Sequence, residues 1–148
     1  MKGRVLLVDD DASLRRALRD RLEHWGLTVD EAADGAAALK AAERREFDVV
    51  VLDLNMPGLG GMDVLARWQE EGYRAAVLVL TAHGSIDAAI AAVRAGAADF
   101  LQKPADFDLL QARLEHLLAA RRQGRMVRAL KERVQDEGGS VIGDSPAM

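Results

Sequence analysis

The amino-acid sequence predicts an α/β fold in which one parallel sheet, doubly wound, carries helices on both faces. Short β-branched runs alternate five times with stretches rich in Ala, Leu and Arg that have a helical period. The runs VVVL and VLVL are typical of strands buried on both faces, as the strands of a parallel sheet are. With 148 residues, the chain accommodates one compact domain and an appendage, but not two full domains.

Five strand-loop-helix units account for most of the chain. The expected strands are Arg4–Val8, Leu27–Glu31, Asp48–Leu52, Ala76–Leu80 and Asp99–Leu101. The expected helices are Ser13–His24, Asp34–Arg44, Gly61–Glu70, Ile86–Ala95 and a last one from Phe107 onward. Ser13, Asp34 and Ser85 are good N-capping residues for three of these helices.

The last helix is longer than a small α/β domain needs, because its period persists for about thirty residues. A three-four spacing of apolar residues, typical of a coiled-coil seam, runs through Phe107, Leu110, Leu114 and Leu117 and resumes in another phase at Val127, Leu130 and Val134. Residues 121–138 are therefore expected to form a helical linker that mediates dimerisation or leads to another domain. The alternative is one long helix that packs on the domain and then frays.

Composition excludes several classes of protein. A net charge of −4 gives the chain no general attraction to nucleic acids or anionic membranes. The absence of cysteine excludes disulfides and thiolate sites and fits the cytoplasm, which is the expected location. No stretch approaches the roughly 20 apolar residues that cross a bilayer, and the first residues do not resemble a signal peptide, so no membrane partner is expected.

Carboxylates gather where two of the predicted strands end. Asp9, Asp10 and Asp11 follow the first strand, and Asp53 ends the buried run VVVL. Because parallel strands end at the same rim of a sheet, these side chains are expected to lie close together, where their repulsion requires a cation. Hard oxygen ligands with open positions favour Mg²⁺.

Two more rim residues indicate phosphoryl chemistry. Thr81 follows the fourth strand and Lys103 follows the fifth. A hydroxyl and an ammonium group at a carboxylate-metal cluster suit an attached phosphoryl group, whose oxygens need donors and whose charge needs a counterion. Asp53 is the expected nucleophile, Lys103 and the metal would neutralise developing charge, and Thr81 would sense the product.

The runs LLVDDD, VVVLDLNMPGLGGMDVL, VLVLTAHGS and ADFLQKP resemble the receiver domains of two-component response regulators, over about residues 4 to 120. The resemblance implies a flavodoxin-like sheet of order 2-1-3-4-5 and phosphorylation of Asp53 by a cognate histidine kinase. It also implies a Mg²⁺ or Mn²⁺ ion bound by Asp10 directly, by Asp9 through water, by Asp53 and by the backbone carbonyl of Asn55.

The same resemblance assigns roles around the site. Thr81 and the aromatic Phe100 are implied to switch together and to reshape the face made by the fourth helix, fifth strand and fifth helix, through which the chain would form a homodimer. Asn55 and His83 lie where side chains tune the lifetime of the phosphoryl group. The Lys103–Pro104 peptide bond is expected to be cis.

The end of the chain, SVIGDSPAM, resembles the opening of the ATPase domain in NtrC-type activators of sigma-54 RNA polymerase. This implies a receiver domain at 1–120, a linker at 121–138 and the start of a truncated AAA+ domain at 139–148. No Walker motif is present, so this piece is not expected to hydrolyse ATP, and nucleic acid would be bound only by domains beyond it.

Two alternatives have different chemistry. Asp9, Asp11 and Ser13 also match the DxDx[ST] loop of haloacid-dehalogenase-type phosphatases, in which Asp9 would be the nucleophile of a turnover enzyme. That family needs a further acidic pair on a later strand, whereas only helix follows Lys103. The other alternative is a stand-alone relay protein or an interaction module, if the likeness at the end of the chain is accidental.

Overall fold

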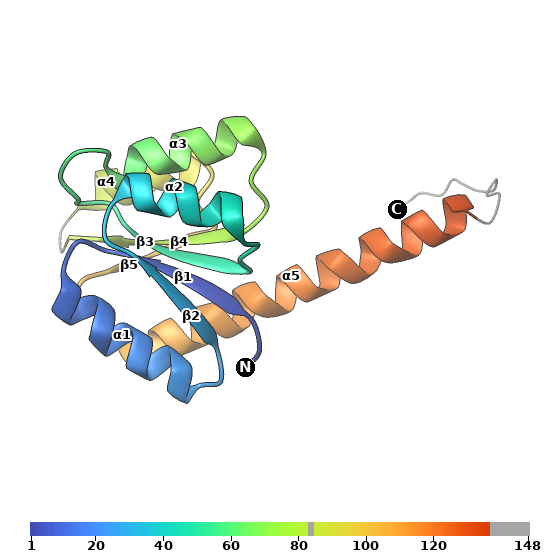
Figure 1. Ribbon diagram of the computed structural model, residues 1–148, viewed down its shortest axis with the longest axis horizontal. Helices are drawn as coiled ribbons and strands as arrows, with labels where there is room; N and C mark the ends of the chain where they lie inside the picture. The colour runs from blue at the N-terminus through green and yellow to red at the C-terminus, as the bar shows by residue number, and fades with distance from the viewer. Residues whose placement is uncertain (83–84, 137–148) are drawn as a thin grey trace. The chain divides into compact units, whose positions relative to one another are not determined.

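A computed structural model of the chain describes residues 1–82 and 85–136, and side chains as far as residue 123. Within these residues, five parallel strands in the order β2-β1-β3-β4-β5 are connected by helices (Figure 1). The strands are β1 (Arg4–Val8), β2 (Thr28–Ala32), β3 (Val49–Asp53), β4 (Ala76–Thr81) and β5 (Asp99–Gln102). The helices are α1 (Ala12–His24), α2 (Gly35–Arg44), α3 (Gly61–Glu71), α4 (Ile86–Arg94) and α5 (Phe107–Asp136). The predicted fold class and strand order are confirmed.

The sheet separates two hydrophobic cores. Alternate residues of β3 point to opposite faces, so Val50 and Leu52 pack into the core under α2, α3 and α4, while Val49 and Val51 pack into the core over α1 and α5. Figure 1 shows α2 and α3 on one side of the sheet and α1 on the other. The continuous apolar run VVVL therefore reflects a strand covered on both faces.

Two structural units divide the chain, Met1–Leu118 and Ala119–Met148. In the first, Leu110, Leu114 and Leu117 of α5 are buried against the sheet. Their three-four spacing thus serves the core of this unit rather than a coiled coil. The second part of the predicted seam lies outside the described side chains. Among the described residues, no helix has the length and apolar character to cross a membrane.

The helix starts show which polar residues act as caps. The Asp34 side chain accepts a hydrogen bond from the amide of Ala37 at 2.8 Å, as expected for an N-cap. In contrast, α1 is capped by Asp11, whose carboxylate accepts from the Leu14 amide at 3.2 Å, so the expectation that Ser13 caps this helix was wrong. The helix begins at Ala12, one residue before the predicted start, because Asp11 at the end of the loop after β1 caps it.

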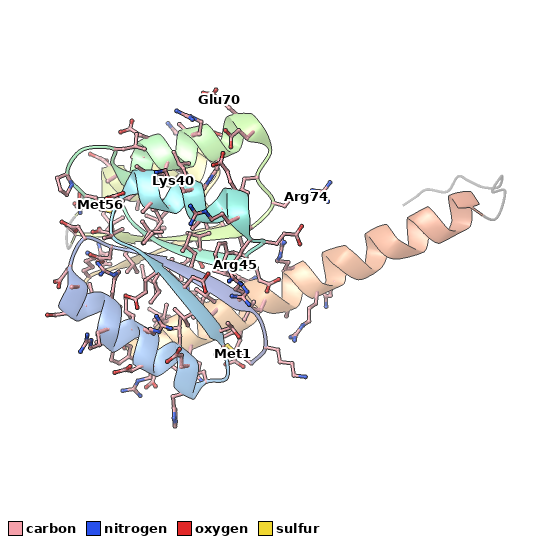
Figure 2. All side chains as sticks on the ribbon, viewed as in Figure 1. Met1, Lys40, Arg45, Met56, Glu70 and Arg74 are labelled. Atoms are coloured by element: carbon pink, nitrogen blue, oxygen red, sulfur yellow. The ribbon has the colours of Figure 1, made fainter. Side chains whose placement is uncertain are left out.

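The carboxyl ends of the central strands are aligned. Val8 pairs with Leu52 across β1 and β3, and Asp53 pairs with Leu80 across β3 and β4. Figure 2 shows Met56, just after β3, at the left end of the sheet, whereas Arg45 and Arg74, which precede β3 and β4, lie to the right. The loops that follow the strands therefore share one rim, where doubly wound sheets bind their ligands.

Candidate functional site

Three carboxylates meet at this rim. Asp9 directly follows β1, Asp53 ends β3, and their side chains are buried, with relative exposures of 2% and 1%. Asp10 is exposed. One oxygen from each of the three carboxylates lies within 4.8 Å of the others. The sheet register brings them together although Asp53 is remote in the sequence.

The Asp9 carboxylate and backbone are held by the N-cap and the first turn of α1. The amide of Asp11 donates to Asp9 Oδ1 at 2.9 Å, and Nη1 of Arg15 donates to the Asp9 carbonyl oxygen at 2.7 Å. Arg15 also pairs with Glu31 at the end of β2, with Nε 2.9 Å from Oε1. Sequence reasoning missed Arg15, although its position one helical turn after Asp11 is a signal that it could reach the loop.

Asp53 sits at a point of close backbone packing. The Asn55 amide donates to Asp53 Oδ1 at 3.0 Å, which restrains the carboxylate. A Cβ atom on Gly61, the first residue of α3, would lie 2.5 Å from the Asp53 carbonyl oxygen, so only glycine fits there. The Asn55 residue itself is exposed.

Lys103 reaches the carboxylates from the far side of β4. Its Nζ lies 3.2 Å from Asp9 Oδ2 and 3.1 Å from Asp53 Oδ1. The Lys103 amide donates to the Thr81 carbonyl oxygen at 2.8 Å, which extends the β4–β5 pairing and anchors the residue. The Lys103–Pro104 peptide bond is cis.

Burial and neighbouring charges shift the pKa values of Asp53 and Lys103. Burial raises the pKa of Asp53, and the nearby Asp9 carboxylate adds to this effect, whereas the Asn55 amide and Lys103 oppose it. Burial alone would lower the pKa of Lys103, but its ion pairs with Asp53 and Asp9 outweigh burial, so the pKa is raised. Asp53 is thus held in surroundings that disfavour its ionised form.

The donor set fits a divalent cation. Among the described residues, three carboxyl groups come together here, and the Lys103 ammonium group pairs with two of them, so acidic groups outnumber the paired cation. All the candidate ligand atoms are hard oxygens, and the exposed Asp10 leaves the group open to solvent, as Mg²⁺ requires when it keeps part of its water shell. Asp9, Asp10 and Asp53 are therefore the residues that could hold a metal.

Thr81 places a hydroxyl at the same rim. It ends β4, beside β3, and is fully buried. Its Oγ1 makes no hydrogen bond with any of the described residues, an arrangement that is unfavourable for a buried hydroxyl unless a ligand completes it. A group with oxygen acceptors would satisfy it.

Phe100 links the rim to a surface groove. It is half-buried, packs against the core on the α3 side of the sheet, and lines a groove of about 490 Å³ with residues of α4, β5 and the start of α5. Nearby, four large apolar side chains are exposed: Ile86, Ile90, Val93 and Leu109. His83, predicted to flank the phosphoryl group, lies outside the described residues.

An open parallel sheet with its polar cluster at the carboxyl ends of the strands defines an α/β protein of the doubly wound class. The family model of the response regulator receiver domain matches residues 5–115. The chain therefore belongs to the response regulator receiver domain family, which confirms the resemblance seen in the sequence motifs.

Known relatives extend beyond this domain. The chain is 35% identical over 147 residues to the alginate biosynthesis transcriptional regulatory protein AlgB of Pseudomonas aeruginosa, covering 99% of the chain and 33% of AlgB. It is 35% identical to the DNA-binding transcriptional regulator NtrC of Escherichia coli K12, covering 99% of the chain and 31% of NtrC. The crystal structure of NtrX from Brucella abortus superposes with a TM-score of 0.84 at 30% identity, covering 98% of the chain and 32% of NtrX. The chain thus spans about a third of the length of the curated relatives it matches.

Proposed function

We propose that this chain is the phosphoacceptor switch of a two-component system, and that Asp53 receives a phosphoryl group from a phosphohistidine of its cognate kinase. The observation that carries the proposal is the Lys103 ammonium group shared by Asp9 and Asp53, within an acidic triad that includes Asp10. Such a cluster at the carboxyl ends of three strands provides a nucleophile, a cation site and a counterion.

The transfer is a substitution at phosphorus. An oxygen of the Asp53 carboxylate forms a bond to phosphorus, the P–N bond of the donor breaks, and the imidazole leaves with the electron pair and takes up a proton from water. Asp9, Asp10, Asp53 and the carbonyl oxygen of Asn55 would hold Mg²⁺ or Mn²⁺, which supplies positive charge to the phosphoryl oxygens when bound. In the later hydrolysis, water attacks the phosphorus, the bond to the Asp53 oxygen breaks, and inorganic phosphate leaves, so the chain acts only on itself and is not a turnover enzyme.

Lys103 and Thr81 stabilise the phosphoryl group once it is attached to Asp53. The Lys103 ammonium group neutralises charge on the phosphoryl oxygens, which it reaches from its position 3.1 Å from Asp53 Oδ1. The buried Thr81 hydroxyl donates to another phosphoryl oxygen and gains the hydrogen bond it otherwise lacks among the described residues. Asn55 and His83, of which His83 lies outside the described residues, are the side chains that we expect to tune its lifetime.

The switch connects the site to the groove. Thr81 of β4 pairs with Gln102 of β5, and Phe100 also lies on β5. Movement of Thr81 toward the phosphoryl group lets the Phe100 ring turn inward and changes the surface of α4, β5 and the start of α5. The exposed apolar residues of α4, among them Ile90 and Val93, are the contacts of the homodimer that forms there.

The complete protein would be a transcriptional activator. The names of AlgB and NtrC describe transcriptional regulators, and the chain covers about a third of each. In this proposal residues 1–120 are the receiver, 121–138 a linker that contributes to the dimer, and 139–148 the start of an AAA+ domain of a sigma-54 activator. DNA is bound by domains beyond this chain, in the cytoplasm. The receiver family assignment leaves the phosphatase hypothesis without support.

The test is phosphorylation by a small donor. The chain is incubated with acetyl phosphate and Mg²⁺, and intact mass and light scattering are recorded before and after. We expect one added phosphoryl group, its loss in Asp53→Asn or with excess EDTA, and a change in oligomeric state. Asp20→Asn, an exposed α1 carboxylate, is the control and should be modified like the wild type. A phosphoryl group on Asp9 with Asp53 unmodified would refute the proposal and favour a phosphatase.

A further inference from the structure

Arg15 connects the loop that carries the acidic residues to the edge of the sheet. Its Nη1 donates to the Asp9 carbonyl oxygen at 2.7 Å, and its Nε donates to Glu31 Oε1 at 2.9 Å. Only 16% of the Arg15 side chain is exposed, and its charge-assisted bond to the Asp9 carbonyl is partly buried, whereas its bond to Glu31 lies at the surface. Helical side chains lean toward the helix N-terminus, which directs this guanidinium group back to the loop.

The bond to the Asp9 carbonyl controls the direction of Asp10. The carbonyl group of Asp9 and the N–H group of Asp10 belong to one planar peptide unit, so holding the first fixes the plane of the second. Asp10 is exposed, and no hydrogen bond from another described residue holds its carboxylate. Among the described residues, the backbone orientation is therefore the constraint that decides which positions this carboxylate can reach.

We propose that Arg15, oriented by Glu31, is a positioning residue of the metal site. It holds the Asp9–Asp10 peptide in the orientation that brings the Asp10 carboxylate to those of Asp9 and Asp53, within 4.8 Å. This inference rests on the proposed metal-dependent function. Partners that orient metal ligands in this way contribute strongly to metal affinity even though they do not touch the metal.

Arg19 also forms an ion pair with Glu31, but it makes no hydrogen bond to a described residue of the loop that carries the acidic residues. Nη1 of Arg19 lies 2.7 Å from Glu31 Oε2, and its Nε lies 3.2 Å from Glu23 Oε2. Within the described part of the chain, its hydrogen-bond partners are these two carboxylates, and none is an atom of the loop. Arg19 thus shares the charge and the Glu31 partner of Arg15 but lacks its main-chain bond, which makes it a matched control.

Electrostatics and positioning predict opposite signs for the loss of Arg15. Removing a positive charge near an acidic cluster lowers the repulsion of an incoming cation and should tighten metal binding. Removing a positioning bond frees the peptide plane and should weaken metal binding. The direction of the change in affinity therefore separates the two explanations.

The experiment measures Mn²⁺ binding to the whole chain through the electron paramagnetic resonance signal of free Mn²⁺. For Arg15→Gln we expect the dissociation constant to rise about tenfold, the lower end of the range for partners of ligands. Arg15→Lys should recover part of the affinity, because an ammonium group reaches one acceptor but not both. Arg19→Gln should stay within about twofold of the wild type, since exposed ion pairs contribute little. Urea unfolding verifies that each variant is folded.

A second readout needs no metal. Amide hydrogen exchange, measured by NMR without Mn²⁺, should be roughly fivefold faster at Asp11 in Arg15→Gln, because this amide is bonded to the Asp9 carboxylate that the loop carries. Should Arg15→Gln be unfolded, the same measurements on Glu31→Gln, with the weaker effect of a misoriented guanidinium, take its place. Unchanged or tighter Mn²⁺ binding in a folded variant overturns the inference. If the wild type neither binds Mn²⁺ nor accepts a phosphoryl group, the proposed function fails and the inference fails with it, whereas a wild type that does both alongside an unaffected Arg15→Gln variant overturns the inference alone.

Discussion

The Nζ atom of Lys103 lies 3.1 Å from Oδ1 of Asp53, so the ends of β5 and β3 are joined by a salt bridge that spans the intervening strand β4. The carboxylate is buried, whereas the lysine side chain retains an exposure of 26%. The same ammonium group contacts Asp9, so one cation holds two repelling carboxylates together in the metal-free protein. The geometry of the site is thus maintained before a divalent cation enters.

Lys103→Gln should destabilise the protein and make its stability depend on Mg²⁺. Without the ammonium group the two buried carboxylates repel each other uncompensated, and we expect a loss of about 2 kcal/mol, below the roughly 3–5 kcal/mol of a fully buried pair because Lys103 is partly exposed. Urea unfolding with and without Mg²⁺ measures it, and Mg²⁺ should restore part of the loss. Lys40→Gln, at an exposed position of α2 that is labelled in Figure 2, should change little. Equal stability of Lys103→Gln and the wild type would contradict the role of the ion pair.

Asp53→Asn should stabilise the metal-free protein at neutral pH. The pKa of Asp53 is raised above its ordinary value of 3.8, mainly by burial, so the folded state binds its proton more tightly than the unfolded state. Ionisation of Asp53 therefore lowers the free energy of unfolding as the pH rises through the pKa that this group has in the folded state. Asparagine does not ionise, so the variant does not lose this stability as the pH rises. Urea midpoints in EDTA should favour Asp53→Asn at about pH 7.5 and converge toward about pH 4. A variant less stable than the wild type at the higher pH would show that attraction by Lys103 outweighs desolvation.

Glu31→Gln should lower stability at neutral pH but not in acid. The hydrogen bond from Arg19, followed by that from Arg15, lowers the pKa of Glu31 below its ordinary value. A lowered pKa means that the stabilisation is present above the unfolded pKa and is lost as pH falls through the folded pKa. We expect a loss of about 0.2–1 kcal/mol per pair at about pH 7, screened by salt, and no difference at about pH 3. A difference that persists in acid would indicate a role in packing instead of charge.

The sequence predicted the strands and the gathering of the acidic residues well, because both depend on simple patterns. A parallel sheet needs continuous apolar runs such as the one that Asp53 ends, and parallel strands must end together, so Asp9 and Asp53 had to share a rim. The elements shifted by one or two residues where a polar side chain capped a helix, as Asp11 does for α1.

The contacts that support the site could not be predicted in the same way. Whether Arg15 bonds the Asp9 carbonyl or only Glu31 depends on side-chain conformation, which no periodicity reveals. The spacing of Leu110 and Leu114 was equally ambiguous, because burial against a sheet and burial in a coiled coil use the same helical face. Only the three-dimensional packing separates these possibilities.

Gly61→Ala should disturb Asp53 through the backbone. The added Cβ atom would lie 2.5 Å from the Asp53 carbonyl oxygen and 2.7 Å from the Leu54 Cα atom, so α3 must shift away from β3. We expect a loss of about 1–3 kcal/mol of unfolding free energy together with slower phosphorylation by acetyl phosphate. Gly60→Ala is the matched control, because the nearest atom to its Cβ lies at 3.6 Å, and it should lose less than about 1 kcal/mol as a poorer N-cap. Normal stability of Gly61→Ala would mean that the loop adjusts freely.

Ile90→Asp should separate phosphorylation from dimerisation. Ile90 is an exposed apolar residue of α4, beside the groove that Phe100 lines, and it makes no part of the acidic site. A carboxylate there would have to be buried without a partner in the proposed dimer, which is unfavourable by several kcal/mol. Intact mass should therefore show full phosphorylation, while light scattering after acetyl phosphate treatment should show monomers where the wild type forms dimers. Ala36→Asp, at an exposed position near the start of α2, adds the same charge and should dimerise normally. If Ile90→Asp dimerises as the wild type does, the α4 face is not the interface, and the second unit of the chain becomes the place to look for it.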